Sequence, residues 1–199
     1  MSAEPGRLLE AIRGLDEITR RLRRECPWDR EQDERSIVPH TVEEAYELAD
    51  AAHSGDDAKL LDELGDVLFQ VYFLALLLEE RGQGSLAEVA EHCRQKLIRR
   101  HPHVFGDRAA ETAGDVVRNW NQIKRDDERG GEIFGEIPET LPSTLYAKKI
   151  LKRAAEAGHE VRPADPLLAA VKTAVDAGQD PELALRRAAD DYRQRVEAE

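Results

Sequence analysis

The stretch that most constrains the fold is the apolar run 67-VLFQVYFLALLL-78, in which Gln70 is polar. A membrane-spanning helix needs about 20 apolar residues, so this shorter run predicts a buried helix of a folded domain. The run is apolar on every side, which is more surface than a single helical hairpin covers. We therefore expect an antiparallel helical bundle whose four-helix core is completed by dimerisation.

Signals for helix starts and ends recur along the chain, and no segment has a convincing strand pattern. Leu8, Ile12 and Leu15 lie three or four residues apart, as on one face of a helix. Thr41 and Glu44 fit the T-x-x-E capping box, which predicts that a helix begins at Thr41. The predicted fold class is therefore all-α. The helices are expected near residues 5–24, 41–53, 57–81, 85–100, 113–128, 143–157, 166–177 and 181–197, with loops over 25–40 and 101–107.

A stretch rich in Gly and Pro, residues 129–142, predicts a linker. It separates a larger helical domain, residues 1–128, from a smaller helical segment, residues 143–199. Residues 85–100 align without gaps with residues 180–195, and both stretches open with a helix-capping residue. Ordinary helix composition also produces such similarity, so the alignment has little weight by itself.

The net charge of −12 limits the partners of the chain. A globally acidic protein repels nucleic-acid backbones and anionic membranes, so we expect neither as a partner. An anionic ligand would need a local basic cluster and a metal ion. Cys26 and Cys93 form no disulfide framework, and the N-terminus has no apolar signal core, so a cytoplasmic location is expected.

Two predicted helices hold pairs of carboxylates at helical spacing. Glu44 and Glu47 share one helix face, as do Glu63 and Asp66. The short turn at 54-SGDD-57 predicts an antiparallel hairpin, in which the two pairs face each other. Such acids repel unless a cation lies between them, and oxygen ligands select Mg²⁺, Mn²⁺ or Ca²⁺ over zinc. Spacing alone favours a simpler alternative, in which these acids cap helices or face water.

Basic and aromatic residues form a second set. Lys96 and Arg100 lie one helical turn apart, as do Trp120 and Lys124. Two cations on one helix face, with a third at Lys124, suit a phosphate chain. The flat ring of Trp120 suits a nucleobase. The alternative is a solvated basic patch and a core tryptophan. Trp28, in the predicted loop, either covers a base or packs in the core.

Five stretches in this order resemble the MazG family of nucleoside triphosphate pyrophosphohydrolases. The resemblance implies an α-helical, usually dimeric protein that binds Mg²⁺ and cleaves nucleoside triphosphates to monophosphates and pyrophosphate. The expected role is house-cleaning of the nucleotide pool. The stretches are 26-CPWDREQ-32, 43-EEAYE-47, 63-ELGDVLFQ-70, 99-RRHPHVFGD-107 and 120-WNQIK-124.

The resemblance also implies roles for particular residues, carried over by their motif positions. Glu43 is the remaining acid of its motif, and we predict that it is the base for the attacking water or a group that supports the ligands. Mg²⁺ is the expected ion, with Mn²⁺ as the other candidate. The implied metal ligands are Glu44, Glu47, Glu63 and Asp66, and the implied nucleotide contacts are Lys96, Arg100, Trp120 and Lys124. Trp28 is a further candidate contact, proposed from its place in the loop and not from the resemblance.

The chain departs from the family pattern in its loop and its tail. Asp33 stands where the family often has Thr, and His40 replaces a frequent Tyr, so base preference stays open. Longer MazG proteins carry two domains, and 141–158 and 180–195 are similar to parts of the second. Because Asp191 stands in the place of Lys96 and no acidic motif remains, residues 143–199 are predicted to be a remnant without a metal site.

Two other functions compete with this prediction. One is a specialised all-α pyrophosphohydrolase that acts on dUTP or phosphoribosyl-ATP, against which the C-P-W-D and R-R-H-P-H-V-F stretches argue. The other is a non-catalytic helical dimer that binds a regulatory nucleotide or a protein. The four retained acids argue against it, because a binding module need not keep them all.

Overall fold

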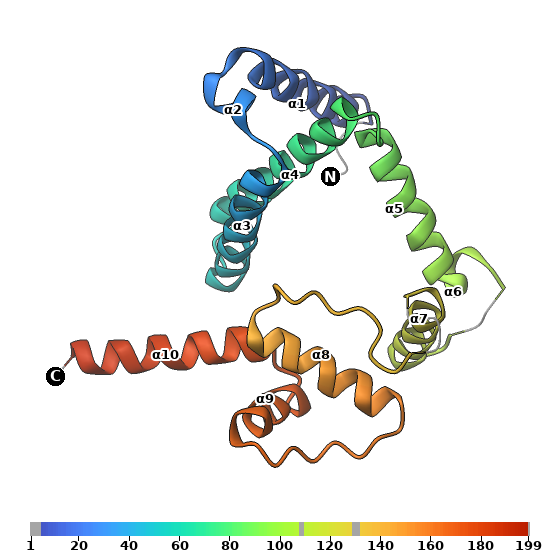
Figure 1. The fold of residues 1–199 in the computed structure, drawn as a ribbon, viewed down its shortest axis with the longest axis vertical. Coiled ribbons are helices and arrows are strands. Elements are labelled where there is room, and N and C mark those ends of the chain that lie inside the picture. The colour runs from blue at the N-terminus through green and yellow to red at the C-terminus, as the bar shows by residue number, and fades with distance from the viewer. Residues whose placement is uncertain (1–4, 108–109, 129–131, 199) are drawn as a thin grey trace. The chain divides into compact units, whose positions relative to one another are not determined.

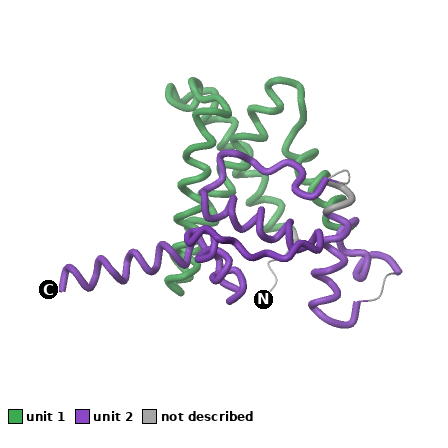
Figure 2. Tube along the Cα trace, turned by 60° about the horizontal axis from the view of Figure 1, so that its bottom comes forward, with its two compact units in different colours: residues 1–98 green, residues 99–199 purple. Residues whose placement is uncertain are grey.

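The computed structural model describes residues 5–107, 110–128 and 132–198, which form ten helices and no strand (Figure 1). The predicted all-α class is confirmed. The chain divides into two compact units, residues 1–98 and 99–199, which Figure 2 shows in different colours. In the predicted linker, residues 129–131 lie outside the described residues and the rest contains no helix.

The first unit contains the helices α1 to α4 and α5 as far as Ile98, and its centre is a hairpin of α3 and α4. These two helices lie side by side in Figure 1. Gly55 ends α3 with a φ of 72°, and the Asp56 side chain then accepts hydrogen bonds from the amides of Ala58 and Lys59 to cap α4. The helices are α1 (Pro5–Glu25), α2 (Pro27–Glu31), α3 (Glu34–Ser54), α4 (Asp57–Glu80) and α5 (Leu86–Arg100).

The predicted loop over residues 25–40 is wrong, because α2 and the first turns of α3 occupy it. Asp33 caps α3 in a reciprocal capping box with Ser36. Pro39 lies inside α3, where its ring nitrogen cannot donate the usual backbone hydrogen bond. Thr41 instead donates its hydroxyl to the carbonyl of Ile37 at 3.3 Å, so the predicted capping box of Thr41 with Glu44 is also wrong.

The apolar run of α4 packs mainly within the first unit. Ile37 of α3 forms a buried cluster with Phe73 and Leu77 of α4. The prediction that this run is a buried helix is therefore confirmed for most of its length. Leu68 and Val71, however, are each 40% exposed.

Helix α1 is fixed to α4 by polar contacts at the end of the hairpin. The Arg20 guanidinium donates to both carboxylate oxygens of Glu79, at 3.0 and 2.7 Å. Arg23 pairs with Glu80 at 2.9 Å. Exposed ion pairs contribute little free energy, so these contacts fix the position of α1 while the buried side chains supply stability.

The second unit contains the last two residues of α5 and the helices α6 to α10. The turn α6 falls where a loop was expected, and Pro102 occupies its first position. The side chains of Asp165 and Asp180 cap α9 and α10. No helix among the described residues combines the length and apolar composition of a membrane span. The helices are α6 (Pro102–Phe105), α7 (Ala113–Glu128), α8 (Ser143–Glu156), α9 (Pro166–Asp176) and α10 (Pro181–Glu197).

Candidate metal centre

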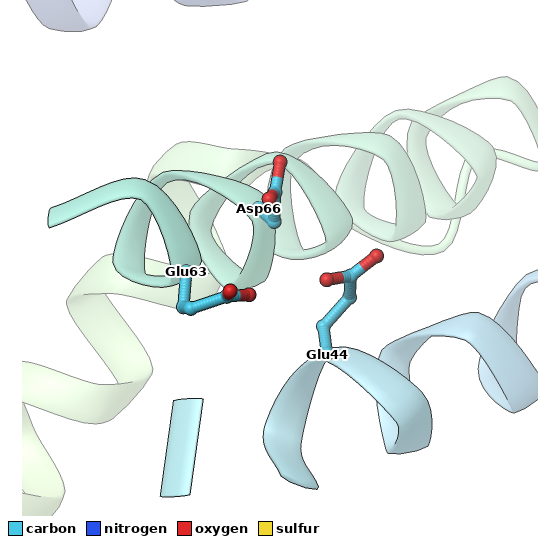
Figure 3. A group of neighbouring side chains, drawn as sticks. All are labelled: Glu44, Glu63 and Asp66. Carbon is cyan, nitrogen blue, oxygen red and sulfur yellow. The ribbon is translucent and has the colours of Figure 1, made fainter. Parts of the chain in front are cut away.

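Three carboxylates converge across the hairpin of α3 and α4 (Figure 3). Glu44 comes from α3, and Glu63 and Asp66 come from α4. Each offers an oxygen within 4.8 Å of the others. We name these three residues the acidic cluster. Its geometry follows from local features of the sequence, because the antiparallel hairpin sets the i, i+3 pair of α4 opposite the acidic turn of α3.

The acidic cluster has negative charge that its own contacts do not neutralise. Glu63 is only 9% exposed, and its Oε2 is buried with no hydrogen-bond partner. Burial raises the pKa of Glu63, and the charges of Glu47 and Asp66 raise it further. Burial also raises the pKa of Glu44, followed by the charges of Asp66 and Glu47. A buried, unpartnered carboxylate oxygen is costly, so this donor set fits a divalent cation.

The remaining acids of the motif lie beside the cluster. Glu47 is exposed and outside the 4.8 Å group, although its charge acts on both Glu44 and Glu63. Glu43 is also exposed, and its Oε2 lies 3.9 Å from the Nδ1 of His40. The structure thus brings together three of the four residues that the sequence suggested as ligands.

The basic and aromatic residues fall in both units. Lys96 is half-buried on α5 in the first unit. In the second unit, the Arg100 guanidinium carbon lies 5.5 Å from the ring centroid of Trp120, and the Lys124 ammonium nitrogen lies 4.9 Å from it. These distances are typical of cation–π contacts, so the structure gathers these three residues into one group.

Trp28 is 52% exposed, which argues against the alternative that it packs in the core. Its ring meets the imidazole of His40 edge-on, with centroids 5.9 Å apart and an angle of 67° between the planes. In the sequence, His40 stands out only as a departure from the family pattern. The sequence carried no usable signal for it, because residue 40 was expected in a loop. In the structure His40 lies four residues before Glu44 within α3, which places both on one face of that helix.

These features define the class of an all-helical protein with a carboxylate cluster suited to a divalent cation. Residues 32–105 match the model of the MazG nucleotide pyrophosphohydrolase domain. The chain is also 40% identical over 205 residues to an uncharacterized 26.1 kDa protein in the blaB 3' region of Streptomyces cacaoi, covering 98% of this chain and 83% of that protein. The chain therefore belongs to the MazG family, as its motifs suggested.

Two further relatives have names that state an activity. The nucleoside triphosphate pyrophosphohydrolase of Escherichia coli K12 is 39% identical over 154 residues, which cover 76% of this chain and 59% of that protein. The protein of the same name from Mycobacterium tuberculosis is 30% identical over 192 residues, which cover 96% and 57%. The chain thus spans a little over half the length of these two relatives.

Proposed function

We propose that this chain is a nucleoside triphosphate pyrophosphohydrolase that depends on Mg²⁺, with Mn²⁺ as the other candidate, and clears unwanted nucleotides from the pool. Its substrates are ribo- or deoxyribonucleoside triphosphates, and its products are the monophosphate and pyrophosphate. The observation that carries the proposal is the acidic cluster with its buried, unpartnered Glu63 oxygen. The names of the two relatives support it.

The acids would hold the cation and move one proton. Glu44, Glu63 and Asp66 are the proposed ligands, and Glu47 is proposed as a fourth. A divalent cation bound there supplies positive charge that polarises phosphate oxygens and makes water more acidic. Water attacks the α-phosphorus, the bond to the β-phosphate breaks, and pyrophosphate leaves. Glu43 is proposed to accept the proton of the attacking water, because it is exposed beside the cluster.

The basic and aromatic residues would bind the nucleotide, an assignment that for all but Trp28 follows the family motifs. Lys96, Arg100 and Lys124 supply positive charge for the phosphates and for the leaving pyrophosphate. Trp120 and Trp28 are the proposed contacts of the nucleoside. The half-exposed ring of Trp28 supports its part of this assignment.

A panel of triphosphates, assayed with and without Mg²⁺, tests the proposal. We expect pyrophosphate release only with the cation, because the uncompensated acids would otherwise repel the substrate. Turnover confined to dUTP or phosphoribosyl-ATP would identify the specialised alternative. Nucleotide binding without any turnover would identify the regulatory dimer. Release of single phosphate would contradict cleavage at the α-phosphorus.

We further propose that residues 143–199 are a remnant of a second MazG-like unit, with one type of site per chain. In the second unit, Pro181, Ala184 and Leu185 of α10 line an apolar groove of about 560 Å³. In the gapless alignment these residues correspond to Leu86, Val89 and Ala90 of α5, which line an apolar groove of the first unit. Aligned positions of α5 and α10 thus each line an apolar groove, which supports a common origin.

We also propose that the chain forms a homodimer through the groove of the first unit. This groove, about 1200 Å³ in volume, lies between α1, α4 and the start of α5. Large apolar side chains line it and remain exposed, and contiguous apolar surface of this kind marks an interface. The twofold partner would cover Leu68 and Val71 of this lining, which the hairpin leaves exposed. The lining includes Leu9, Ile12, Leu68, Val71 and Val89.

Sedimentation at micromolar concentration should therefore give twice the chain mass of 22.4 kDa. Leu68→Glu should shift the protein to the monomer, because a charge in the apolar interface is costly to bury. Ile18→Glu is the matched control, since Ile18 is 58% exposed but does not line the groove. A monomeric unchanged chain would contradict the dimer.

A further inference from the structure

Trp28 and His40 form an exposed pair of rings beside the acidic cluster. Trp28 is 52% exposed and the His40 side chain is 47% exposed. Their edge-on contact, with centroids 5.9 Å apart, is a favourable arrangement of two rings. We name these two residues the ring pair. The metal ligands proposed above do not include either ring.

The position of Trp28 is fixed by the backbone around it. Arg23 donates hydrogen bonds to the carbonyl oxygens of Asp29 and Gln32, at 2.5 and 3.0 Å, which ties α2 to the end of α1. The Gln32 amide donates to the carbonyl oxygen of Trp28 at 2.8 Å. These hydrogen bonds fix the backbone at Trp28, whose side chain is exposed. The exposed ring is available to stack on a flat ligand.

The ring pair lies close to the proposed metal site along α3. His40 and Glu44 are four residues apart, so they share a helix face and are separated by a rise of about 6 Å. The Nδ1 of His40 lies 3.9 Å from the Oε2 of Glu43, the proposed base. A nucleotide with its phosphates at the acidic cluster would extend its sugar and base about one helical turn away. A flat base then fits the flat ring of Trp28.

We propose that His40 is a specificity residue that contacts the edge of the nucleobase while Trp28 stacks on its face. This inference rests on the proposed function, and it adds a residue that the family motifs do not assign. The imidazole directs Nδ1 toward Glu43 and has a second nitrogen, Nε2, for a hydrogen bond to the base. Base edges differ in their donors and acceptors, so one such bond distinguishes between bases.

The test compares kcat/KM for ATP, GTP, CTP and UTP in the unchanged chain and in His40→Leu. We expect the ratio between the best and the worst base to fall about tenfold, through KM, while kcat changes less than twofold. His40→Tyr keeps a ring beside Trp28 but replaces the imidazole, so it should alter the order of the bases. His53→Leu is the control, because His53 is exposed at the far end of the same helix.

Inorganic tripolyphosphate separates a contact with the base from a contact with the phosphates. As a competitive inhibitor it has no base, so its inhibition constant should be unchanged in His40→Leu. An equal loss for all four nucleotides and for tripolyphosphate would overturn the inference. A change of sedimenting mass with unchanged base ratios would also overturn it, and would make the ring pair a protein contact.

Calorimetric binding of the four nucleotides keeps this test separate from the proposed function. If the unchanged chain released no pyrophosphate, the proposed function would fail, but the binding ratios would still test His40. If the chain released pyrophosphate and both His40 variants kept the original base ratios, only the present inference would fail. Circular dichroism of both variants checks that the helices remain folded.

Discussion

Glu63→Gln is expected to lower Mg²⁺-dependent pyrophosphate release by about 100-fold or more, and to raise the unfolding temperature of the metal-free protein. The loss follows because a charged ligand to the cation becomes neutral, and a bound cation is worth several kcal/mol to the transition state. The gain follows because Glu63 is a buried carboxylate beside other acids, and its Oε2 has no partner. Initial rates and thermal unfolding in a chelator measure the two effects.

Asp62→Asn is the matched control for this variant. It removes the same charge from the neighbouring position of α4, but Asp62 is exposed and lies outside the acidic cluster. Its rate and its unfolding temperature should therefore stay close to those of the unchanged chain. Full activity of Glu63→Gln would remove Glu63 from the site, and a lower unfolding temperature would show that its carboxylate stabilises the fold.

The hairpin and its acids could be predicted because the signals for them are local. Gly55 and Asp56 mark the turn between the helices, and the i, i+3 spacing of Glu63 and Asp66 sets them on one face of α4. The rotation of α3 about its own axis is set by its packing against other helices and not by its local sequence. Glu44 and Glu47 differ by about 60° around that axis, so packing decides which one enters the 4.8 Å group.

The start of α3 could not be read from the sequence, because one pattern indicates a start near Thr41 and another indicates a start near Glu34. Pro39 and the T-x-x-E pattern at Thr41 both indicate a later start. The reciprocal capping by Asp33 and Ser36 forms instead, and it allows α3 to continue through the proline. This earlier start has a functional consequence. It places His40 inside the helix, one turn before Glu44, and the pairing with Trp28 depends on that placement.

Stability of the protein should depend on Mg²⁺ more strongly at neutral than at acid pH. The pKa values of Glu44 and Glu63 lie above their ordinary value of 4.5 in the folded chain. Without a cation, the folded state therefore holds protons that the unfolded state has lost. These two residues stabilise the fold below pH 4.5, and that contribution is lost as the pH rises through their raised pKa values.

A bound cation reverses this loss, because it favours the charged forms of the same carboxylates. At a Mg²⁺ concentration about 100 times its dissociation constant, we expect an increase of roughly 5–10 °C in unfolding temperature at pH 7.5. At pH 5 the increase should be smaller, since protons compete for Glu44 and Glu63. Thermal unfolding at both pH values measures the increase caused by Mg²⁺. Glu63→Gln is the comparison, because it removes one of the two carboxyl groups at which protons compete with the cation. An equal or larger increase at pH 5 would mean that Mg²⁺ binds elsewhere, because proton competition at these two carboxylates can only weaken binding as the pH falls.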